Sequence, residues 1–156
     1  MRIGNLALAI SAVALAASAA SARGGQAATA PAADPAGVIA GRQAGMRMSA
    51  ALMASIKSAI DRGDDVRPQG FAAGAIVGWA KAIPGMFPEG SFAPPTEALS
   101  TVWSDPVGFK GKAENYQIAA GLLAKAAAAG DREGFASAFG QVRGTCAACH
   151  DIYKKP

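Results

Sequence analysis

Apolar side chains recur at every third or fourth position in four long segments of this chain, and that helical period is the strongest constraint on its fold. The first segment follows Asp34-Pro35, a pair typical of helix starts, and it ends at Gly63. We predict a helix over residues 35–62. Its expected inner face consists of Ile39, Gln43, Met46, Ala50, Met53, Ile56 and Ile60.

A second helix is predicted over residues 68–83, between two prolines. Its expected inner face consists of Phe71, Ala75, Trp79 and Ile83. The stretch that follows, from Pro84 to Phe109, holds five prolines and three glycines and has no sustained period. Because long segments without regular structure usually serve a site, we expect an ordered loop that covers something apolar.

Two further helices are predicted after the loop. Asp105-Pro106 starts the third, Gly130 ends it, and Asp131 caps the fourth. Their expected inner faces are Phe109, Ala113, Tyr116, Ala120 and Leu123 in the third, and Phe135, Phe139, Val142, Cys146, Cys149 and Tyr153 in the fourth. No segment requires a strand. The predicted fold class is therefore all-α, an antiparallel up-down-up-down four-helix bundle with a long loop between helices 2 and 3.

Both cysteines and the single histidine lie together in CAACH, residues 146–150. A disulfide between Cys146 and Cys149 would close too short a loop to stabilise the chain much, and it leaves His150 unexplained. A thioredoxin-type redox pair follows a strand, whereas a helix precedes this motif. Structural zinc requires four ligands, and the chain offers two thiols and one imidazole.

The pattern C-x-x-C-H is typical of covalent haem c attachment. One helical turn separates Cys146 from Cys149, so their thiols can reach the two vinyl groups along one porphyrin edge. His150 follows Cys146 by four residues and lies on nearly the same face. We predict one covalently attached haem c, with His150 bound to its iron. A haem-free bundle with a spare redox pair is the structural alternative, which a Soret band in the purified protein would exclude.

The first 22 residues have the pattern of a secretory signal peptide: Arg2, an uncharged run of small and apolar residues, and a small-residue cleavage site before Arg23. The uncharged run is long enough to be a transmembrane anchor, but the cleavage site favours export without a membrane segment. The predicted domains are a signal peptide over 1–22, a flexible lead over 23–33 and a haem domain over 34–156.

Several motifs accompany CAACHDIYK at the end of the chain. They are RQAGM in the first predicted helix, FPEGS and TEALSTVWSDPVGF in the loop, and AAAAGDREGFASAFGQVRGTC leading into CAACH. Together they resemble the cytochrome c-prime family of bacterial four-helix-bundle haem proteins, over essentially the whole mature chain. The resemblance implies a left-handed antiparallel bundle with haem between its helices, often as a homodimer.

The resemblance also implies roles for individual residues. It assigns the thioethers and the proximal iron bond to the CAACH residues already named. Arg42 and Gln43 match a pair near the haem propionates, and Thr96 and Glu97 match the loop that approaches the haem edge. Lys154 stands where most members carry arginine beside the proximal histidine, which keeps the charge but loses the guanidinium fork.

The role of Met46 decides between two functions that the resemblance implies. It lies four residues after Arg42, where the family faces the distal side of the iron. In low-spin members a methionine here binds the iron and the protein carries electrons. In high-spin members the residue is not a ligand, and the site admits nitric oxide or carbon monoxide. We predict that Met46 binds the iron in a periplasmic one-electron carrier that serves redox partner proteins; the gas-binding protein is the alternative.

Neither catalysis nor nucleic-acid binding is indicated. No nucleophile with a base, carboxylate pair or phosphate-binding loop is recognisable, and the only histidine is assigned to iron. The formal net charge is only +4, and no basic run occurs beyond Lys154-Lys155. We therefore expect a protein that is not an enzyme and has no nucleic-acid partner.

Overall fold

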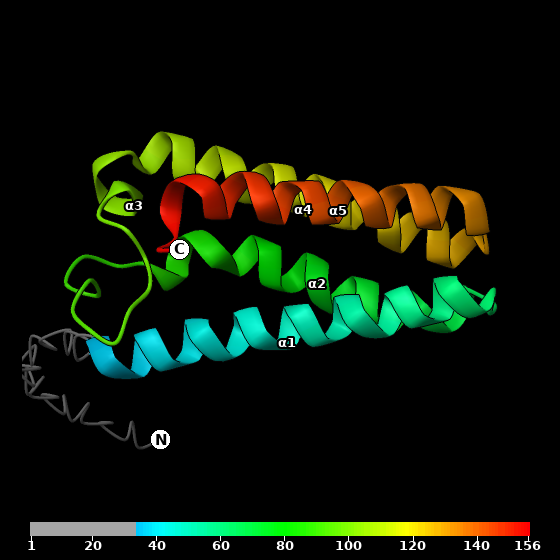
Figure 1. The fold of residues 1–156 in the computed structure, drawn as a ribbon, viewed down its shortest axis with the longest axis horizontal. Coiled ribbons are helices and arrows are strands. Elements are labelled where there is room, and N and C mark those ends of the chain that lie inside the picture. The colour runs from blue at the N-terminus through cyan, green and yellow to red at the C-terminus, as the bar shows by residue number, and fades with distance from the viewer. Residues whose placement is uncertain (1–33) are drawn as a thin grey trace, which may run out of the picture. The chain divides into compact units, whose positions relative to one another are not determined.

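The computed structural model describes residues 34–156, so the predicted signal peptide and lead lie outside the described residues. The helices are α1 (Pro35–Arg62), α2 (Gly70–Ala82), α3 (Thr101–Ser104), α4 (Pro106–Ala129) and α5 (Arg132–Tyr153). Figure 1 shows the four long helices lying side by side, with each running opposite to the one before it. The predicted antiparallel bundle is confirmed, and residues 34–156 contain no strand.

Capping residues determine where α1, α4 and α5 begin and where α1 and α4 end. The side chains of Asp34, Asp105 and Asp131 accept hydrogen bonds from backbone N–H groups in the first turns of α1, α4 and α5. Gly63 and Gly130 follow α1 and α4 in the left-handed conformation, at φ 69° and 70°, which glycine adopts without a Cβ penalty. The bounds predicted for helices 1, 3 and 4 are therefore confirmed.

The middle of the chain corrects two predictions. The helix expected over 68–83 is a shorter α2 between 3-10 turns at Arg67–Gln69 and Ile83–Met86. The face of α2 that points into the bundle also differs from the predicted one: Phe71, predicted to lie on it, is 86% exposed. The buried residues of α2 are Ala72, Ala73, Ile76 and Ala80. Small side chains on this face allow α2 to pack closely against α4, and the bulky Phe71 is left outside.

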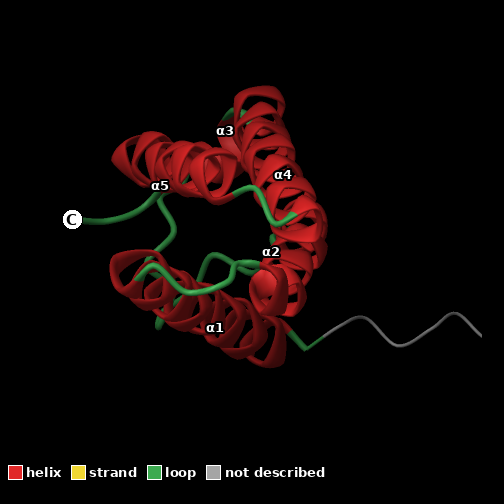
Figure 2. Cartoon of the chain, turned by 90° about the vertical axis from the view of Figure 1, so that its right-hand side faces the viewer, coloured by secondary structure: helices red, strands yellow, loops and turns green. Residues whose placement is uncertain are grey.

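The bundle is packed unevenly. Figure 2, viewed along the helices, places α1, α2, α4 and α5 in that order around the interior. α4 makes extensive contacts with α2 and α5, whereas α1 contacts α2 and α5 much less. The side between α1 and α5 is therefore the less closely packed part of the bundle. None of the helices described here combines the length and the hydropathy needed to cross a membrane.

The long loop lies at the end of the bundle where α1 begins and α5 ends (Figure 1). It contains the four-residue helix α3, which is too short to produce a recognisable period in the sequence. The loop is also paired with the end of the chain: the Leu99 N–H donates to the Tyr153 carbonyl at 2.9 Å, and the Lys155 N–H donates to the Glu97 carbonyl at 2.8 Å. These bonds hold the loop beside the helix that carries CAACH.

A side-chain hydrogen bond joins the end of α5 to the start of α4. The Tyr153 hydroxyl donates to Asp105 at 2.7 Å. This bond, together with the backbone N–H of Gly108, lowers the pKa of Asp105. The same bond, followed by burial, raises the pKa of Tyr153 to about 12. Each group therefore favours the protonation state that keeps the bond intact at neutral pH.

Replacing Tyr153 with Phe should raise the pKa of Asp105 toward its ordinary value. A carboxyl with a lowered folded-state pKa stabilises the protein at neutral pH, and that stabilisation is lost as the pH falls through the folded-state pKa. A tyrosine with a raised folded-state pKa stabilises the folded protein below about pH 10, and this stabilisation is lost as the pH rises from about 10 to about 12. The parent should therefore lose more stability than Tyr153→Phe at both extremes, measured by urea unfolding. Carbon-13 titration should leave the Asp105 pKa unchanged in the control Tyr116→Phe; an unchanged value in Tyr153→Phe would contradict the prediction.

Candidate cofactor-binding site

Two adjoining cavities lie among α1, α4, α5 and the long loop. The loop-side cavity is about 310 Å³ and the inner cavity about 510 Å³. Ligand sites in proteins span roughly 300–1,000 Å³. Residues that line both cavities are Met46, Ala50, Phe109, Cys149 and His150. The shared walls make the two cavities parts of one site.

All eight residues predicted for the site line these cavities. Cys146 lines the inner cavity, and Cys149, His150 and Met46 line both. The other four predicted residues line only the loop-side cavity: Arg42, Gln43, Thr96 and Glu97. The structure therefore brings together residues from α1, the loop and α5 that are far apart in the sequence.

The two cysteines are half-buried and carry free thiols. Burial raises the pKa of both, and the nearby Cys146 raises that of Cys149 further. Redox-active cysteines have lowered pKa values, because the thiolate is the reacting form. The surroundings of Cys146 and Cys149 thus disfavour thiol–disulfide chemistry and leave two neutral thiols facing an apolar cavity.

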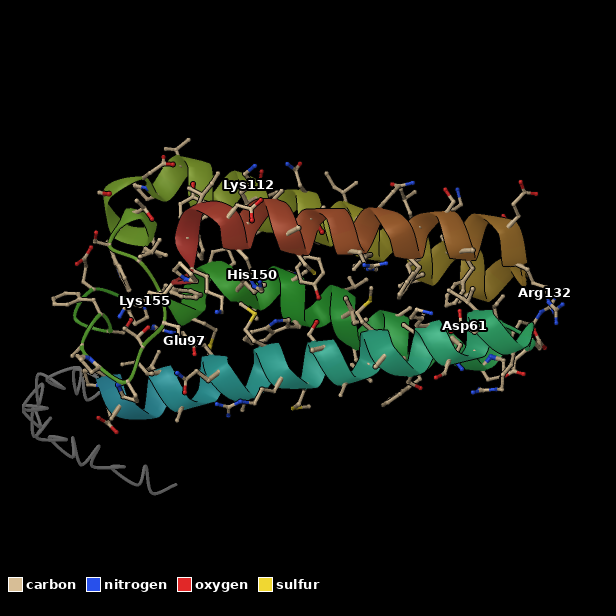
Figure 3. The ribbon with its side chains drawn as sticks, viewed as in Figure 1. Asp61, Glu97, Lys112, Arg132, His150 and Lys155 are labelled. Atoms are coloured by element: carbon tan, nitrogen blue, oxygen red, sulfur yellow. The ribbon has the colours of Figure 1, made fainter. Side chains whose placement is uncertain are left out.

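The His150 imidazole lies between α5 and α1 in Figure 3. Burial and the charge of Lys154 lower its pKa, while Asp151 and Glu97 act in the opposite direction. The neutral imidazole is the form that binds a metal. Within residues 34–156, however, no three His, Cys, Asp or Glu side chains lie close enough to hold one ion. Cys146, Cys149 and His150 therefore fit a large group such as a porphyrin, which different residues hold at different atoms. They do not fit a bare metal ion, which needs several ligands around one point.

Met46 projects from the opposite helix, α1, and lines both cavities. Its side chain is partly buried against the core. Ala50, one turn further along α1, is small and leaves room beside it. A group between α1 and α5 could therefore meet the Met46 thioether from one helix and the His150 imidazole from the other.

Arg42 and Gln43 both hold the loop. Arg42 is 3% exposed, and its guanidinium stacks over Phe87, 4.4 Å from the ring centre. Its terminal nitrogens donate to Met86 O at 3.2 Å, Ser91 Oγ at 2.8 Å, Ser91 O at 2.7 Å and Thr96 Oγ1 at 2.6 Å. Gln43 donates to the Pro95 carbonyl at 3.0 Å. The contacts of Arg42 and Gln43 with the haem propionates, which the resemblance implies, stay a prediction. Both terminal nitrogens of Arg42 are bonded to the loop, so only its Nε is free to donate to a propionate.

The two loop residues predicted for the site differ in their surroundings. Thr96 is buried, and besides accepting from Arg42 it accepts from Lys155 Nζ at its carbonyl, 3.2 Å away. Glu97 is exposed and forms an ion pair with Lys154 at 3.2 Å. Exposed pairs of this kind contribute little to stability. Thr96 is therefore part of the loop structure, whereas Glu97 places a charge at the cavity opening.

Sequence reasoning missed several lining residues. Ser49 and Tyr116 form a buried hydrogen bond at 2.5 Å within the inner cavity, and burial raises the pKa of Tyr116 to about 12. Ser49 follows Met46 by three residues, so its helical position could have identified it. Other missed residues include the basic side chains Arg47, Lys57, Lys112 and Arg143.

The sequence matches known members of one protein family. The sequence profile of the family Cytochrome C' matches residues 37–154. A cytochrome c' from Alcaligenes xylosoxydans xylosoxydans is 42% identical over 71 residues, which are 44% of this chain and 56% of that relative. One from Pararhodospirillum photometricum is 38% identical over 82 residues, 52% of this chain and 66% of the relative. Each matched segment thus spans less than two thirds of the relative's length.

Solved structures match over a longer part of the chain. The cytochrome c' of Thermochromatium tepidum has a TM-score of 0.74 and 28% identity, covering 80% of this chain and 98% of that one. A nitric oxide complex of a cytochrome c prime variant from Alcaligenes xylosoxidans has a TM-score of 0.73, 26% identity and the same coverage. A cytochrome c' described as having ligand-controlled dimer dissociation has a TM-score of 0.75 and 25% identity, covering 80% and 99%.

Proposed function

Since this chain belongs to the cytochrome c' family and carries covalently attached haem c, we propose that it is a periplasmic one-electron carrier and not an enzyme. When bound, the haem supplies an iron that changes between the ferric and ferrous states. Cys146 and Cys149 anchor it through thioethers, and His150 binds the iron from α5. The predicted signal peptide supports export, and redox partner proteins supply and accept the electron.

The position of Met46 carries this proposal. Its thioether lines both cavities from α1, while His150 lines them from α5. A second protein ligand fills the coordination position at which a small molecule would otherwise bind. Methionine opposite histidine also raises the reduction potential of haem, as suits a carrier that accepts electrons. The proposed carrier therefore depends on a bond between the Met46 sulfur and the iron.

The electronic spectrum of the ferric protein tests this bond. The parent should be low-spin, with a weak far-red charge-transfer band from sulfur to iron, and Met46→Ala should be high-spin and lack the band. Met48→Ala is the matched control, because Met48 is 66% exposed on the same helix and lines neither cavity. A high-spin parent with a spectrum that Met46→Ala leaves unchanged would refute the carrier proposal.

Gas binding is the second candidate function. The related Alcaligenes xylosoxidans variant forms a nitric oxide complex. If Met46 does not bind the iron, the coordination position on its side is open to a diatomic ligand. The high-spin spectrum described above, together with nitric oxide or carbon monoxide binding that does not require displacement of methionine, would favour this function over electron transfer.

A homodimer through α1 and α2 is proposed as the assembly, as the relative with ligand-controlled dimer dissociation suggests. Ala51, Ser55, Gly74 and Gly78 form its exposed small-residue surface, and Phe71 adds a large apolar side chain at the start of α2. Two neighbouring small residues do not belong to this surface, because Ala73 is fully buried and Ala54 lines the inner cavity.

Sedimentation equilibrium tests the assembly. The parent should be dimeric at concentrations of about tens of micromolar, and Phe71→Lys should shift it toward monomer, because a charge replaces an apolar contact. Ile118→Lys is the control, since Ile118 is also exposed but lies on α4. A monomeric parent at these concentrations would contradict the proposal.

A further inference from the structure

Positive charge is concentrated around the two cavities. Among residues 34–156, six Lys and Arg side chains line them, whereas Glu97 is the only Asp or Glu side chain that does so. Arg42 is buried beneath the loop and does not reach the surface. The other five form what we call the cationic rim: Arg47, Lys57, Lys112, Arg143 and Lys154.

The cationic rim follows the two sides of the cavity opening. α1 contributes Arg47 and Lys57, α5 contributes Arg143 and Lys154, and Lys112 comes from α4. Arg47, Lys57 and Arg143 are exposed although they line a cavity, so they lie where the cavities meet solvent. Four of the five rim residues thus lie on α1 and α5, the helices that flank the less closely packed side, and Lys112 lines the inner cavity from α4.

Much of this charge is not neutralised by the protein itself. Lys57 pairs with Asp61 and Lys154 with Glu97. Within the part of the chain that the structure describes, Arg47, Lys112 and Arg143 have no ion-pair partner. Five acidic residues lie at the other end of the bundle, in its turns and the adjoining helix ends: Asp61, Asp64, Asp65, Asp131 and Glu133. Figure 3 shows Asp61 at that end, far from Glu97 and His150.

Small apolar side chains lie between the charges. Ala50 and Ala54 are exposed on α1 between Arg47 and Lys57, and both line the inner cavity. They leave the surface of α1 between the two basic residues free of bulky side chains, so another surface can approach closely there. A small apolar centre with a charged rim is the usual composition of a transient protein interface.

From this arrangement we propose that the cationic rim docks an acidic surface patch of a redox partner protein over the cavity opening. The proposal rests on the proposed carrier function. One electron passes between partner and chain in each encounter, so one is oxidised as the other is reduced, and no bond forms or breaks. Cations beside a low-dielectric cavity focus their field and accelerate association with an acidic partner by about tenfold to a thousandfold at low salt.

Binding of an acidic polypeptide to the haem-containing protein tests the docking surface independently of electron transfer. Poly-L-glutamate should bind at low ionic strength, measured by calorimetry, and Arg47→Gln/Arg143→Gln should weaken binding about tenfold. Lys81→Gln/Lys125→Gln removes the same charge from exposed positions that line neither cavity, and it should weaken binding less than about twofold. Equal weakening by the two double variants, or equally tight binding of poly-L-lysine, would overturn the proposal.

Oxidation of the ferrous protein by small one-electron oxidants separates this proposal from the carrier function. The rate with the hexacyanoferrate(III) anion should fall as ionic strength rises from about 10 to about 500 mM, and the rate with the tris(phenanthroline)cobalt(III) cation should rise. The Arg47→Gln/Arg143→Gln variant should reduce both salt effects. Oxidation by both reagents without any dependence on salt or on the rim variant would overturn the docking surface alone. Failure to react with either reagent would overturn the carrier function and the docking surface together.

Discussion

A Cys146→Ala/Cys149→Ala variant should release its haem completely into acidified organic solvent, whereas the parent should retain it. Both thiols are half-buried on α5, one helical turn apart, and both line the inner cavity. Each can add across one vinyl group of a porphyrin, which forms a carbon–sulfur bond without a leaving group. Because burial raises the pKa of both thiols, the cavity itself does not favour their oxidation to a disulfide.

The single variants refine this prediction. Cys146→Ala and Cys149→Ala should each retain haem, because one thioether is enough to prevent extraction, and each should show the absorption shift of a remaining vinyl group. Thr145→Ala is the control: Thr145 lines the same cavity but has no thiol, so the haem should stay fully attached. Retention of haem by the double variant would show that attachment does not occur through CAACH.

The helices could be predicted from the sequence because their ends are determined locally. Asp34, Asp105 and Asp131 cap helices through bonds to neighbouring backbone groups, and Gly130 ends α4 through its own backbone conformation. Such signals need no knowledge of tertiary structure. The CAACH donors were predictable for the same reason, since their spacing on one helix fixes their relative positions.

Features that depend on tertiary packing were not predictable in this way. Phe71 fits an apolar period yet is exposed, because the close contact of α2 with α4 uses the smaller residues beside it. Ala50 fits the inner face of α1 but is exposed beside the cavities, while the polar residues Arg42 and Ser49 are buried. Arg42 is buried because the loop folds over it, and loop paths depend on contacts between residues distant in sequence.

Replacing Arg42 with Leu should lower the free energy of unfolding by about 3 kcal/mol, because it leaves buried acceptors in the loop without a donor. Four hydrogen bonds and the stacking over Phe87 are lost together. Arg47→Leu is the matched control: Arg47 lies on the same helix but is exposed, so the change should stay within about 0.5 kcal/mol. Urea unfolding of the haem-containing protein measures both values.

Arg42→Lys separates the two roles considered for Arg42. A lysine keeps the positive charge but cannot reproduce the fork that bonds Ser91 and Thr96 at once. If Arg42 mainly clamps the loop, Arg42→Lys should lose most of the stability that Arg42→Leu loses, and the Ser91 and Thr96 amides should exchange faster with solvent in both variants, while amides in α4 stay protected. If its charge mainly serves the haem propionates, the lysine should restore stability and leave the loop amides protected. Because its terminal nitrogens are already bonded to the loop, we expect the first result.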